Sequence, residues 1–541
     1  MGLLNDKRIK IITDSNKQRV YFLLIAFLLA FSVRIIGIRS QPAIFHPTKQ
    51  YYSALLSRSY YLNTEKHRYE QERIPSLMFR NSKDKLEPGI NELLTYLMYV
   101  MAGKEDLLIP RLMSVLYWLT GGVFIYKIAF LFFGGTGAVF SLIFYLFFPF
   151  GINISQSIQS ESLLNMFFLW AVLQIVKYFR SDNRKYFYSA ALLSGFAVLL
   201  KLTMIFPLAG IVLFAGINKY GLKEFLFKWR TVWFFLLFFT VGLSFYFYNI
   251  LWNTAMRGAA SSVIFPGLLK LSYFWKGWLI QTGKVTGVVP LLLGVLLLLT
   301  IKNKETQSML SGLLAGYFTF GLAFSYTTAT HDYYQLALFP ITALMLGQAG
   351  YLLKHPGKME KRNPGLTLSA SYAVLCAAVV FSLFHQFSFV QSDHKLKMWS
   401  PAFFLVGEQG SFFANNIPEK NIIENAKKIG EITGHSINNI FLSRSYGHTV
   451  MYYGAMFGKT WPTEEDLNFR RLRGLENLSA DRLYFSKFEN IKPGFFIITD
   501  LDSWKKQPDL QKFLRETFEI FSKKKEYIIF NLRKKKSGNG E

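Results

Sequence analysis

Charged side chains interrupt three apolar stretches of this sequence. Lys201 stands within "FAVLLKLTMIFPL", Glu161 within "SIQSESLLNMF", and Glu87 precedes a Pro-Gly turn in "KLEPGINELL". A lysine at the centre of a membrane helix costs roughly 2.5–3.5 kcal/mol, so such positions suggest function. A lysine can bind a phosphate, and a carboxylate can accept a proton from an attacking hydroxyl. Lys201 is therefore a candidate anion-binding residue, and Glu161 and Glu87 are candidate bases, although Glu161 could also simply favour a helix dipole.

A second polar cluster lies in "THDYYQLALFPI", at the start of another apolar segment. It contains a titratable ring, a carboxylate and two hydroxyls in succession: His331, Asp332, Tyr333 and Tyr334. An aspartate can merely cap a helix, and tyrosine pairs are common at membrane interfaces. The combination of these groups at one point favours a substrate-binding role.

A third cluster, "FHPTKQYYSALLSRSYYL" at residues 45–62, follows the first apolar segment. Its polar members are His46, Lys49, Gln50 and Arg58. The segment is aromatic and carries no carboxylate, so we expect it to hold a phosphate or substrate.

Repeated apolar segments must position these clusters. The chain has 541 residues, of which 51% are hydrophobic. Apolar runs of about 17–25 residues can cross a hydrocarbon core of about 30 Å. The sequence therefore predicts a multi-pass helical membrane protein with about 11 transmembrane helices, while residues 90–100 could enter the membrane without crossing it. The predicted spans are 20–38, 110–133, 136–152, 160–179, 186–200, 203–218, 231–251, 286–301, 308–325, 333–353 and 367–389.

Charge predicts the orientation of these spans. The N-terminal segment and four alternate loops, 177–186, 218–230, 301–308 and 354–365, are rich in Lys and Arg. By the positive-inside rule, the N-terminus is cytoplasmic and the three polar clusters face outward from the inner (plasma) membrane. The net charge of +27 resides largely in short loops, so we expect anionic lipid and no nucleic acid as its partner.

The last part of the chain, residues 391–541, differs in character. Residues 419–433 and 508–518 have helical apolar spacing, whereas 438–443, 494–500 and 526–532 are rich in β-forming residues. We therefore expect a transmembrane domain at 1–390, including a first outer loop at 39–109, and an extracytoplasmic α/β soluble domain at 391–541 that ends in a disordered basic tail.

Motifs of soluble enzymes are missing from the sequence. It has no Walker loop, GxSxG, HExxH or CxxC pair. The sequence therefore indicates no certain cofactor and no zinc site, and it leaves a divalent metal open without supporting one.

Five stretches occur in order on one predicted face: "FHPTKQYYSALLSRSYY", "LEPGINELL", "FPFGINISQSIQSESLL", "LLKLT" and "HDYYQLALFPITALMLG". Together they resemble the bacterial family-39-type glycosyltransferases, which are grouped with the dolichyl-phosphate-mannose protein mannosyltransferases and resemble the lipid A aminoarabinose transferases. The resemblance implies the GT-C fold. It also implies an enzyme that moves a sugar from a polyprenyl-phosphate donor to an acceptor glycan, lipid or protein at the outer face.

The resemblance also implies roles for individual residues. Lys201 matches a lysine expected near the lipid phosphate, and Arg58 matches an arginine on the helix of the first loop. The relatives carry an Asp-Glu pair in that loop where this sequence has Lys49 and Gln50. The base must then come from elsewhere, from Glu161 or Glu87 and less readily from Asp332 or His46.

Two other functions remain open. A non-enzymatic flippase or lipid-binding membrane protein could use the same phosphate contacts, and the missing acidic pair favours it. A secondary transporter would place its polar groups near the bilayer midplane, whereas here they gather at one face.

Overall fold

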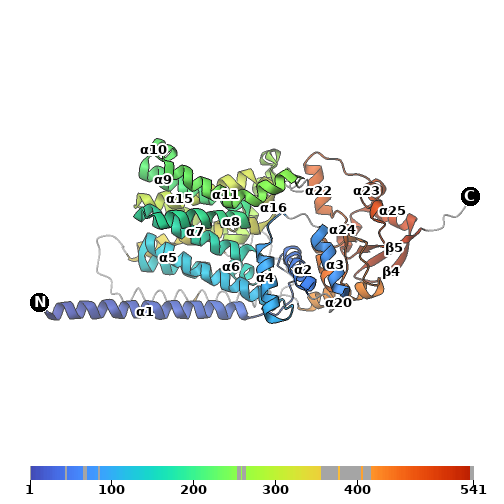
Figure 1. The fold of residues 1–541 in the computed structure, drawn as a ribbon, viewed down its shortest axis with the longest axis horizontal. Coiled ribbons are helices and arrows are strands. Elements are labelled where there is room, and N and C mark those ends of the chain that lie inside the picture. Colours follow the sequence, from blue (N-terminus) through green and yellow to red (C-terminus); the bar gives the residue numbers. More distant parts are fainter. Residues whose placement is uncertain are drawn as a thin grey trace, which may run out of the picture. The chain divides into compact units, whose positions relative to one another are not determined.

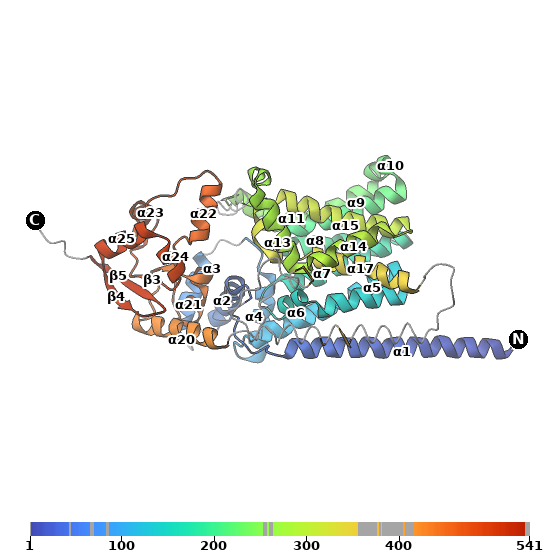
Figure 2. The same cartoon turned by 180° about the vertical axis from the view of Figure 1, so that it is seen from behind.

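The computed structural model divides into two compact units (Figures 1 and 2). Unit 1 comprises Met1–Ser40, Asp84–Asn91 and Leu108–Ala414, and unit 2 comprises Gln41–Lys83, Glu92–Leu107 and Asn415–Glu541. The structure describes residues 2–42, 45–64, 70–82, 86–252, 257–258, 263–354, 376–377, 380, 404–405 and 416–535.

Unit 1 is built from helices that pack side by side (Figure 1). Its α-helices are α1 (Gly2–Ile35), α5 (Leu108–Phe147), α6 (Pro149–Ser155), α7 (Glu161–Ser181), α8 (Arg184–Leu200), α9 (Ile205–Tyr220), α10 (Leu222–Phe227), α11 (Trp229–Trp252), α13 (Ser272–Thr286), α14 (Val288–Leu299), α15 (Lys304–Ala323), α16 (Ser325–Thr330) and α17 (Leu338–Lys354). In the described part of this unit, the short 3₁₀ helices η1 (Leu202–Met204), η2 (Pro266–Lys270) and η3 (Asp332–Gln335) connect them. The predicted spans up to residue 353 coincide with these helices, and the predicted span 367–389 lies outside the described residues apart from positions 376, 377 and 380.

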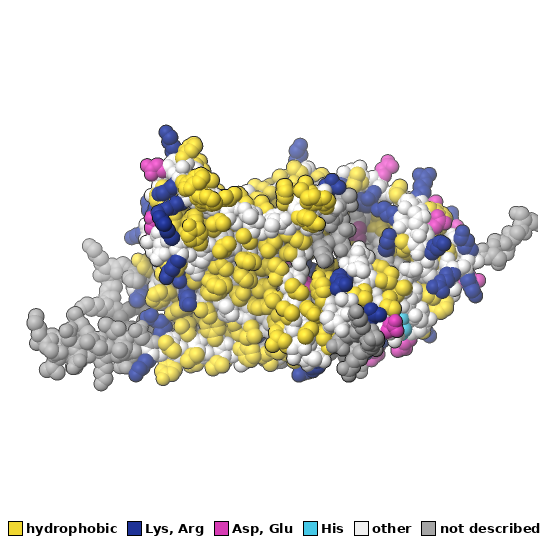
Figure 3. All heavy atoms as spheres, in the orientation of Figure 1, with side chains coloured by type: hydrophobic (Ala, Val, Ile, Leu, Met, Phe, Trp, Pro, Cys, Tyr) yellow, Lys and Arg dark blue, Asp and Glu magenta, His cyan; other side chains and the backbone are white. Residues whose placement is uncertain are grey.

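Several helices of unit 1 are suited to a membrane. Among the described residues, five are long and apolar enough to cross one: Lys17–Ile35, Leu108–Phe147, Glu161–Ser181, Leu202–Tyr220 and Trp229–Trp252. The pair α13 and α14 passes the same test as a sixth span, bent by 86°. Figure 3 shows hydrophobic side chains covering the face of these helices, with Lys and Arg gathered at the end where α10 lies.

Glycines determine two breaks in the helices of unit 1. Gly134 has φ 73° and ψ −170° inside α5, at the junction between the predicted spans 110–133 and 136–152. Gly287, with φ 67°, joins α13 to α14 at the bend. Both conformations lie in the region that side chains with a Cβ rarely adopt, so a glycine permits each turn.

A buried arginine compensates for another break, between α5 and α6. Phe148 is extended and Pro149, which has no N–H group, begins α6, so helical hydrogen bonding is interrupted there. The Arg34 guanidinium from α1 donates to the Leu146 carbonyl and to the Ser155 hydroxyl, both at 2.8 Å. This buried cation thus satisfies the Leu146 carbonyl, a backbone acceptor beside the break.

Unit 2 contains a five-stranded sheet in the order β2-β1-β3-β5-β4. Its strands are β1 (Asn439–Leu442), β2 (Gly458–Thr460), β3 (Phe495–Ile498), β4 (Phe518–Lys523) and β5 (Ile528–Lys535). β1 is parallel to β2 and β3, whereas β5 is antiparallel to β3 and β4. Helices of the unit are α2 (Pro47–Thr64), α3 (Glu70–Ser82), α4 (Ile90–Ala102), α20 (Asn416–Ile432), α21 (His448–Tyr453), α22 (Glu464–Leu472), α23 (Ala480–Lys487), α24 (Leu501–Lys505) and α25 (Pro508–Thr517).

The alternation of side chains along the strands gives this sheet two apolar faces. One face, with Ile440, Phe496 and Phe530, packs in a core with residues of α23, α24 and α25. The other face, with Phe441 and Ile497, packs in a second core with residues of α2, α3, α20 and α21. Segments of the predicted first outer loop therefore cover one face of the sheet formed by the C-terminal part of the chain.

Candidate functional site

Lys201 lies where α8 ends. Its backbone is extended (φ −156°, ψ 116°) between the last turn of α8 and η1, so the side chain leaves the helical path. The residue is only 3% exposed. Its Nζ lies 2.9 Å from Oε1 of Glu161, the first residue of α7, which is fully buried. A buried lysine and a buried carboxylate predicted separately from the sequence therefore form one ion pair.

Two tyrosines of η3 lie beside the ammonium group. The Nζ of Lys201 lies 4.8 Å from the ring centroid of Tyr333 and 4.2 Å from that of Tyr334. A cation over an aromatic face is attracted by the ring quadrupole, and this attraction is stronger where water is excluded. Lys201, Glu161, Tyr333 and Tyr334 thus form a single cluster, called here the Lys201 site.

The two remaining residues of the predicted second cluster lie beside these tyrosines. The His331 ring is 5.3 Å from the Tyr333 ring and 5.9 Å from the Tyr334 ring, between centroids. Its Nδ1 is 2.6 Å from the Thr330 hydroxyl. Asp332 is buried at the first position of η3. Both residues are therefore adjacent to the Lys201 site along the chain.

A further tyrosine, Tyr246 of α11, fixes the backbone on either side of Lys201. Its hydroxyl donates to the Leu199 carbonyl at 3.2 Å and accepts from the Leu202 N–H at 3.1 Å. Glu87, which is half-buried, interacts electrostatically with Tyr246. The sequence prediction missed Tyr246, because one tyrosine in the aromatic, apolar run 233–248 carries little signal.

A hydrogen-bonded network holds η3 in place. The Tyr317 hydroxyl of α15 donates to Oε1 of Gln335 at 2.6 Å and accepts from the Trp278 indole of α13 at 2.8 Å. Gln335 in turn donates to the Thr328 carbonyl at 2.9 Å. Since Gln335 ends the 3₁₀ turn that carries Tyr333 and Tyr334, this network restrains both rings.

The residues of the predicted third cluster lie in unit 2. His46 adopts φ 47° just before α2, and the His46 carbonyl accepts from the backbone N–H groups of Lys49 and Gln50. Gln50 is fully buried and its side chain donates to the Phe45 carbonyl. Lys49 is partly exposed in the first turn of α2.

Arg58 is held by contacts within unit 2. Its Nε is 2.9 Å from both carboxylate oxygens of Glu105, and its Nη1 donates to the Tyr452 carbonyl at 2.7 Å. Its guanidinium carbon lies 3.5 Å from the centroid of the Tyr452 ring. Burial is the largest single influence and lowers the pKa of Arg58, but the charges of Glu105, Tyr452 and Glu72 together outweigh it, so the net result is a raised pKa. These contacts account for the charge of Arg58 and favour a structural role over phosphate binding.

The Lys201 site can bind an anion and accept a proton within one cluster. The ammonium can hold a phosphate oxygen, and the carboxylate can act as a base. Among the described residues, no group of three or more His, Cys, Asp or Glu side chains is arranged to hold a metal ion.

Comparisons with known proteins bear on this site. The model of the dolichyl-phosphate-mannose-protein mannosyltransferase family matches residues 88–252, a range that contains Glu161 and Lys201. Comparison with curated proteins finds no match.

Solved structures share the fold over nearly the whole chain. ArnT from Cupriavidus metallidurans in the apo state matches with a TM-score of 0.56 and 12% identity, covering 95% of this chain and 98% of ArnT. The same protein bound to undecaprenyl phosphate matches with a TM-score of 0.53 and 14% identity, over 94% and 98% of the two chains. The archaeal oligosaccharyltransferase AglB from Archaeoglobus fulgidus, in complex with an inhibitory peptide and a dolichol-phosphate, matches with a TM-score of 0.52 and 10% identity, over 93% and 73%.

These findings confirm the predicted fold class, a GT-C membrane fold with a small C-terminal α/β region. The family match, together with the shared fold, confirms the resemblance to GT-C glycosyltransferases and the enzyme class that it implies.

Proposed function

We propose that this chain transfers a sugar from a polyprenyl-phosphate donor to an acceptor glycan, lipid or protein at the outer face of the inner membrane, with Lys201 holding the donor phosphate. The N-terminus is then cytoplasmic, and the polar clusters face outward. The relatives support a lipid-phosphate donor, since one ArnT structure contains undecaprenyl phosphate and the AglB structure contains a dolichol-phosphate.

The observation that carries the proposal is the buried ion pair of Lys201 and Glu161. Taking two charges out of water costs several kcal/mol per ion, and replacing such a pair with apolar residues is often neutral or stabilising. Packing alone therefore does not account for this pair in an apolar unit, whereas a site that binds a phosphate requires its cation. The Tyr333 and Tyr334 rings restrict where that phosphate can approach.

The ion pair couples the two halves of the reaction. As the acceptor oxygen attacks the anomeric carbon, its proton passes to Glu161, and the bond from that carbon to the phosphate oxygen breaks with its electron pair on the phosphate. Protonation neutralises the carboxylate just as negative charge grows on the leaving group. The Lys201 charge is then available to the phosphate at the moment of bond breaking.

Glu87 is the second candidate for the base. It is half-buried and lies in unit 1, the unit that also contains Lys201. In this arrangement Glu161 would keep Lys201 in position, and Glu87 would accept the proton. Separate substitutions distinguish the two carboxylates.

The test uses the full chain in proteoliposomes that contain a radiolabelled pool of polyprenyl-phosphate sugars. We expect Lys201→Met to lower transfer of the label by about 10²–10³-fold and to weaken binding of undecaprenyl phosphate. Substitution of the true base, Glu161→Gln or Glu87→Gln, lowers transfer by about 10²–10⁴-fold while phosphate binding persists. Exposed Lys276→Met and Glu224→Gln are the matched controls.

Unchanged transfer in the Lys201→Met protein would contradict the proposed phosphate site. If neither glutamate substitution slows transfer, the base is not one of these two residues.

The resemblance implies an acidic pair where this sequence has Lys49 and Gln50. That difference favours one alternative, a flippase that only moves the lipid-linked sugar between leaflets. The same vesicles separate the two functions. A transferase converts the label into a new glycoconjugate, whereas a flippase changes only the leaflet that carries the labelled lipid.

A further inference from the structure

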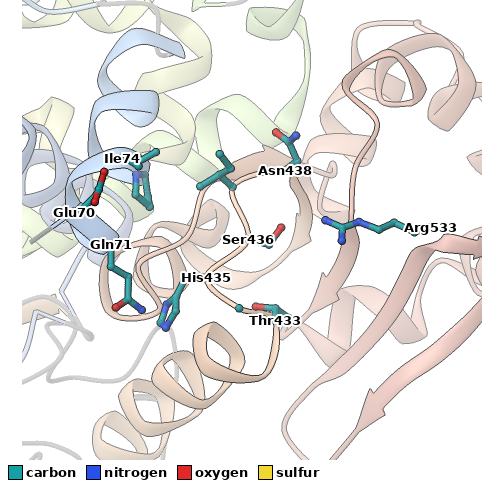
Figure 4. A pocket seen from close by; sticks show the side chains of 11 residues that line it. Glu70, Gln71, Ile74, Thr433, His435, Ser436, Asn438 and Arg533 are labelled. Atoms are coloured by element: carbon teal, nitrogen blue, oxygen red, sulfur yellow. The ribbon is translucent and has the colours of Figure 1, made fainter.

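Unit 2 contains a pocket that no part of the Lys201 site lines. Its volume is about 470 Å³, within the range of about 300–1,000 Å³ that small-molecule sites occupy. Three segments line it: the start of α3, the loop 433–438 that joins α20 to β1, and Arg533 on β5 (Figure 4). The pocket therefore brings together the predicted first outer loop and the C-terminal sheet within one unit.

The loop at the base of this pocket has an unusual backbone. α20 ends at Ile432, and Gly434 follows in the left-handed region with φ 61°, as helix ends commonly do. His435 adopts φ 52°, so a second left-handed residue follows that is not a glycine. Strained residues of this kind persist where the surroundings hold them, and they are frequent at ligand sites.

The contact that His435 makes with Gly454 indicates which ring nitrogen can accept a hydrogen bond from a ligand. Nδ1 lies 2.7 Å from the Gly454 carbonyl oxygen. Because a carbonyl can only accept, Nδ1 carries the proton, and the neutral ring leaves Nε2 as an acceptor. His435 lines the pocket and therefore supplies it with an aromatic acceptor.

The charged groups of the pocket stand on different segments. Figure 4 shows Glu70 and Gln71 on α3, Arg533 reaching in from β5, and Ser436 and Asn438 on the loop between them. The Glu70 carboxylate also lies 4.0 Å from Arg73, on the same helix. A simple anion would meet a carboxylate here and a simple cation would meet Arg533. Ile74, Pro75 and Ile437 supply apolar surface beside these polar groups, so the lining is of mixed character.

A ligand with many hydroxyls fits this lining, because each hydroxyl both donates and accepts. Carboxylate and imidazole acceptors face one part of such a ligand, and guanidinium and amide donors face another. We propose that this pocket binds a saccharide of two or three sugar residues. That this saccharide belongs to the acceptor rests on the proposed function, but the binding itself does not.

The test measures binding of soluble trisaccharides to the full chain in detergent. The probes are mannotriose, chitotriose and trigalacturonate, and calorimetry or saturation-transfer NMR reports their affinity. We expect at least one to bind, and its affinity to fall by about ten-fold or more in Arg533→Ala and in Glu70→Gln, since each removes a charged hydrogen-bonding partner. Both residues are exposed, so the substitutions leave the fold intact, and exposed Arg515→Ala and Glu516→Gln are the matched controls.

The proposal is overturned if none of the three trisaccharides binds, or if the pocket variants and the controls bind equally. It is also overturned if inorganic phosphate binds in a manner that depends on Arg533 while the trisaccharides do not, because the pocket would then be an anion site. The assay contains no lipid donor, so it reports binding at this pocket independently of sugar transfer. If the chain binds a saccharide but transfers no sugar, the proposed function is contradicted and the proposed saccharide pocket is not.

Discussion

At the scale of single residues, Lys201 and Glu161 depend on one another. Each is buried, and Nζ lies 2.9 Å from Oε1, so removing one partner leaves the other charge without its counter-ion at that distance. Breaking a buried pair by removing one partner costs about 3–5 kcal/mol. We expect Lys201→Met and Glu161→Leu each to lower the free energy of unfolding by about that amount. The double variant should be more stable than either single variant, as thermal unfolding in micelles will report.

The control for this cycle is the exposed ion pair of Arg230 and Asp182, at 3.3 Å. Solvent screens the attraction between exposed charges, so its cycle should show little coupling. If the losses in the free energy of unfolding from the Lys201 and Glu161 substitutions are additive, the two charges do not interact in the folded protein.

The pair of Arg58 and Tyr452 leads us to expect that the stability of unit 2 depends on pH. Burial raises the pKa of Tyr452 well above its ordinary value of about 10, and the positive charge of Arg58 only partly offsets the rise. A group whose pKa is raised on folding contributes stability that is complete below its unfolded pKa and is lost at higher pH. We expect unit 2 to lose stability as the pH rises above about 10, when the unfolded tyrosine ionises. Tyr452→Phe should flatten this alkaline loss, measured by the thermal midpoint between pH 8 and 11.

Arg58→Ala tests the same cluster at neutral pH. The substitution removes the guanidinium that pairs with Glu105. The Glu105 carboxylate then keeps the hydrogen bond that the Tyr452 hydroxyl donates at 2.6 Å. A loss of about 3–5 kcal/mol is expected, with the Lys201 site unaffected. A variant of normal stability that fails to bind undecaprenyl phosphate would instead support the phosphate-binding role predicted from sequence.

Sequence reasoning finds residues that break the apolar pattern and misses those that do not. Lys201 was identifiable because a charge is costly in an apolar run, and Tyr333 and Tyr334 because they adjoin His331 and Asp332. Tyr246 was not, since a tyrosine fits an aromatic segment without any polar neighbour. The partner of Arg58 was also missed, because Glu105 lies in an ordinary polar turn 47 residues away.

At the scale of elements, α9 and α15 pack through glycines. A Cβ at Gly210 would overlap the Gly312 carbonyl, and a Cβ at Gly316 would overlap the Phe206 carbonyl. Small residues let membrane helices approach this closely. We expect Gly312→Leu to separate the two helices and to destabilise the protein by at least about 1–3 kcal/mol, seen as a lower thermal midpoint.

Thr319→Leu is the matched control, because it adds bulk on an exposed face of the same helix. Since η1 directly precedes α9, the Gly312 variant should also weaken undecaprenyl phosphate binding at Lys201. If Gly312→Leu and Thr319→Leu are equally stable, the interface between α9 and α15 tolerates a larger separation of the two helices.

Elements with strong periodicity were predictable, and short ones were not. The expected strands 438–443, 494–500 and 526–532 correspond to β1, β3 and β5, and the expected helices 419–433 and 508–518 correspond to α20 and α25. β2 has only three residues, and β4 is largely exposed, so neither shows a buried apolar pattern. The two strands are defined by pairing with β1 and β5, which no local pattern reveals.

At the scale of the whole molecule, unit 2 is assembled from distant parts of the chain. Tyr51, Leu55 and Phe79 of the first loop share a core with Phe441, Ile497 and Ile529 of the sheet. A fragment of residues 416–535 would expose this apolar face. We expect the fragment alone to bind a hydrophobic dye and to unfold without a cooperative transition, and added peptide 45–82 to restore cooperativity.

A peptide with Tyr51→Asp and Leu55→Asp is the control, since both side chains are buried in that core. If the fragment folds cooperatively without any peptide, the C-terminal part is an independent domain, as the boundary at residue 391 predicted. The sequence could not indicate the shared core, because the periodicity of α2 does not specify which sheet its apolar face covers.

Unit 2 combines segments from both ends of the chain, so it can fold only after the C-terminal segment has been synthesised. More than four hundred residues separate the end of α3 from the start of β5. At about 5–20 residues per second, the ribosome takes roughly 20–90 s to deliver the second part after the first. During that interval the apolar side of α2 has no sheet to cover. We therefore expect newly made chains to need a chaperone that shields α2 until the sheet is complete, and an early stop codon to destabilise the first loop as well as to remove the C-terminal part.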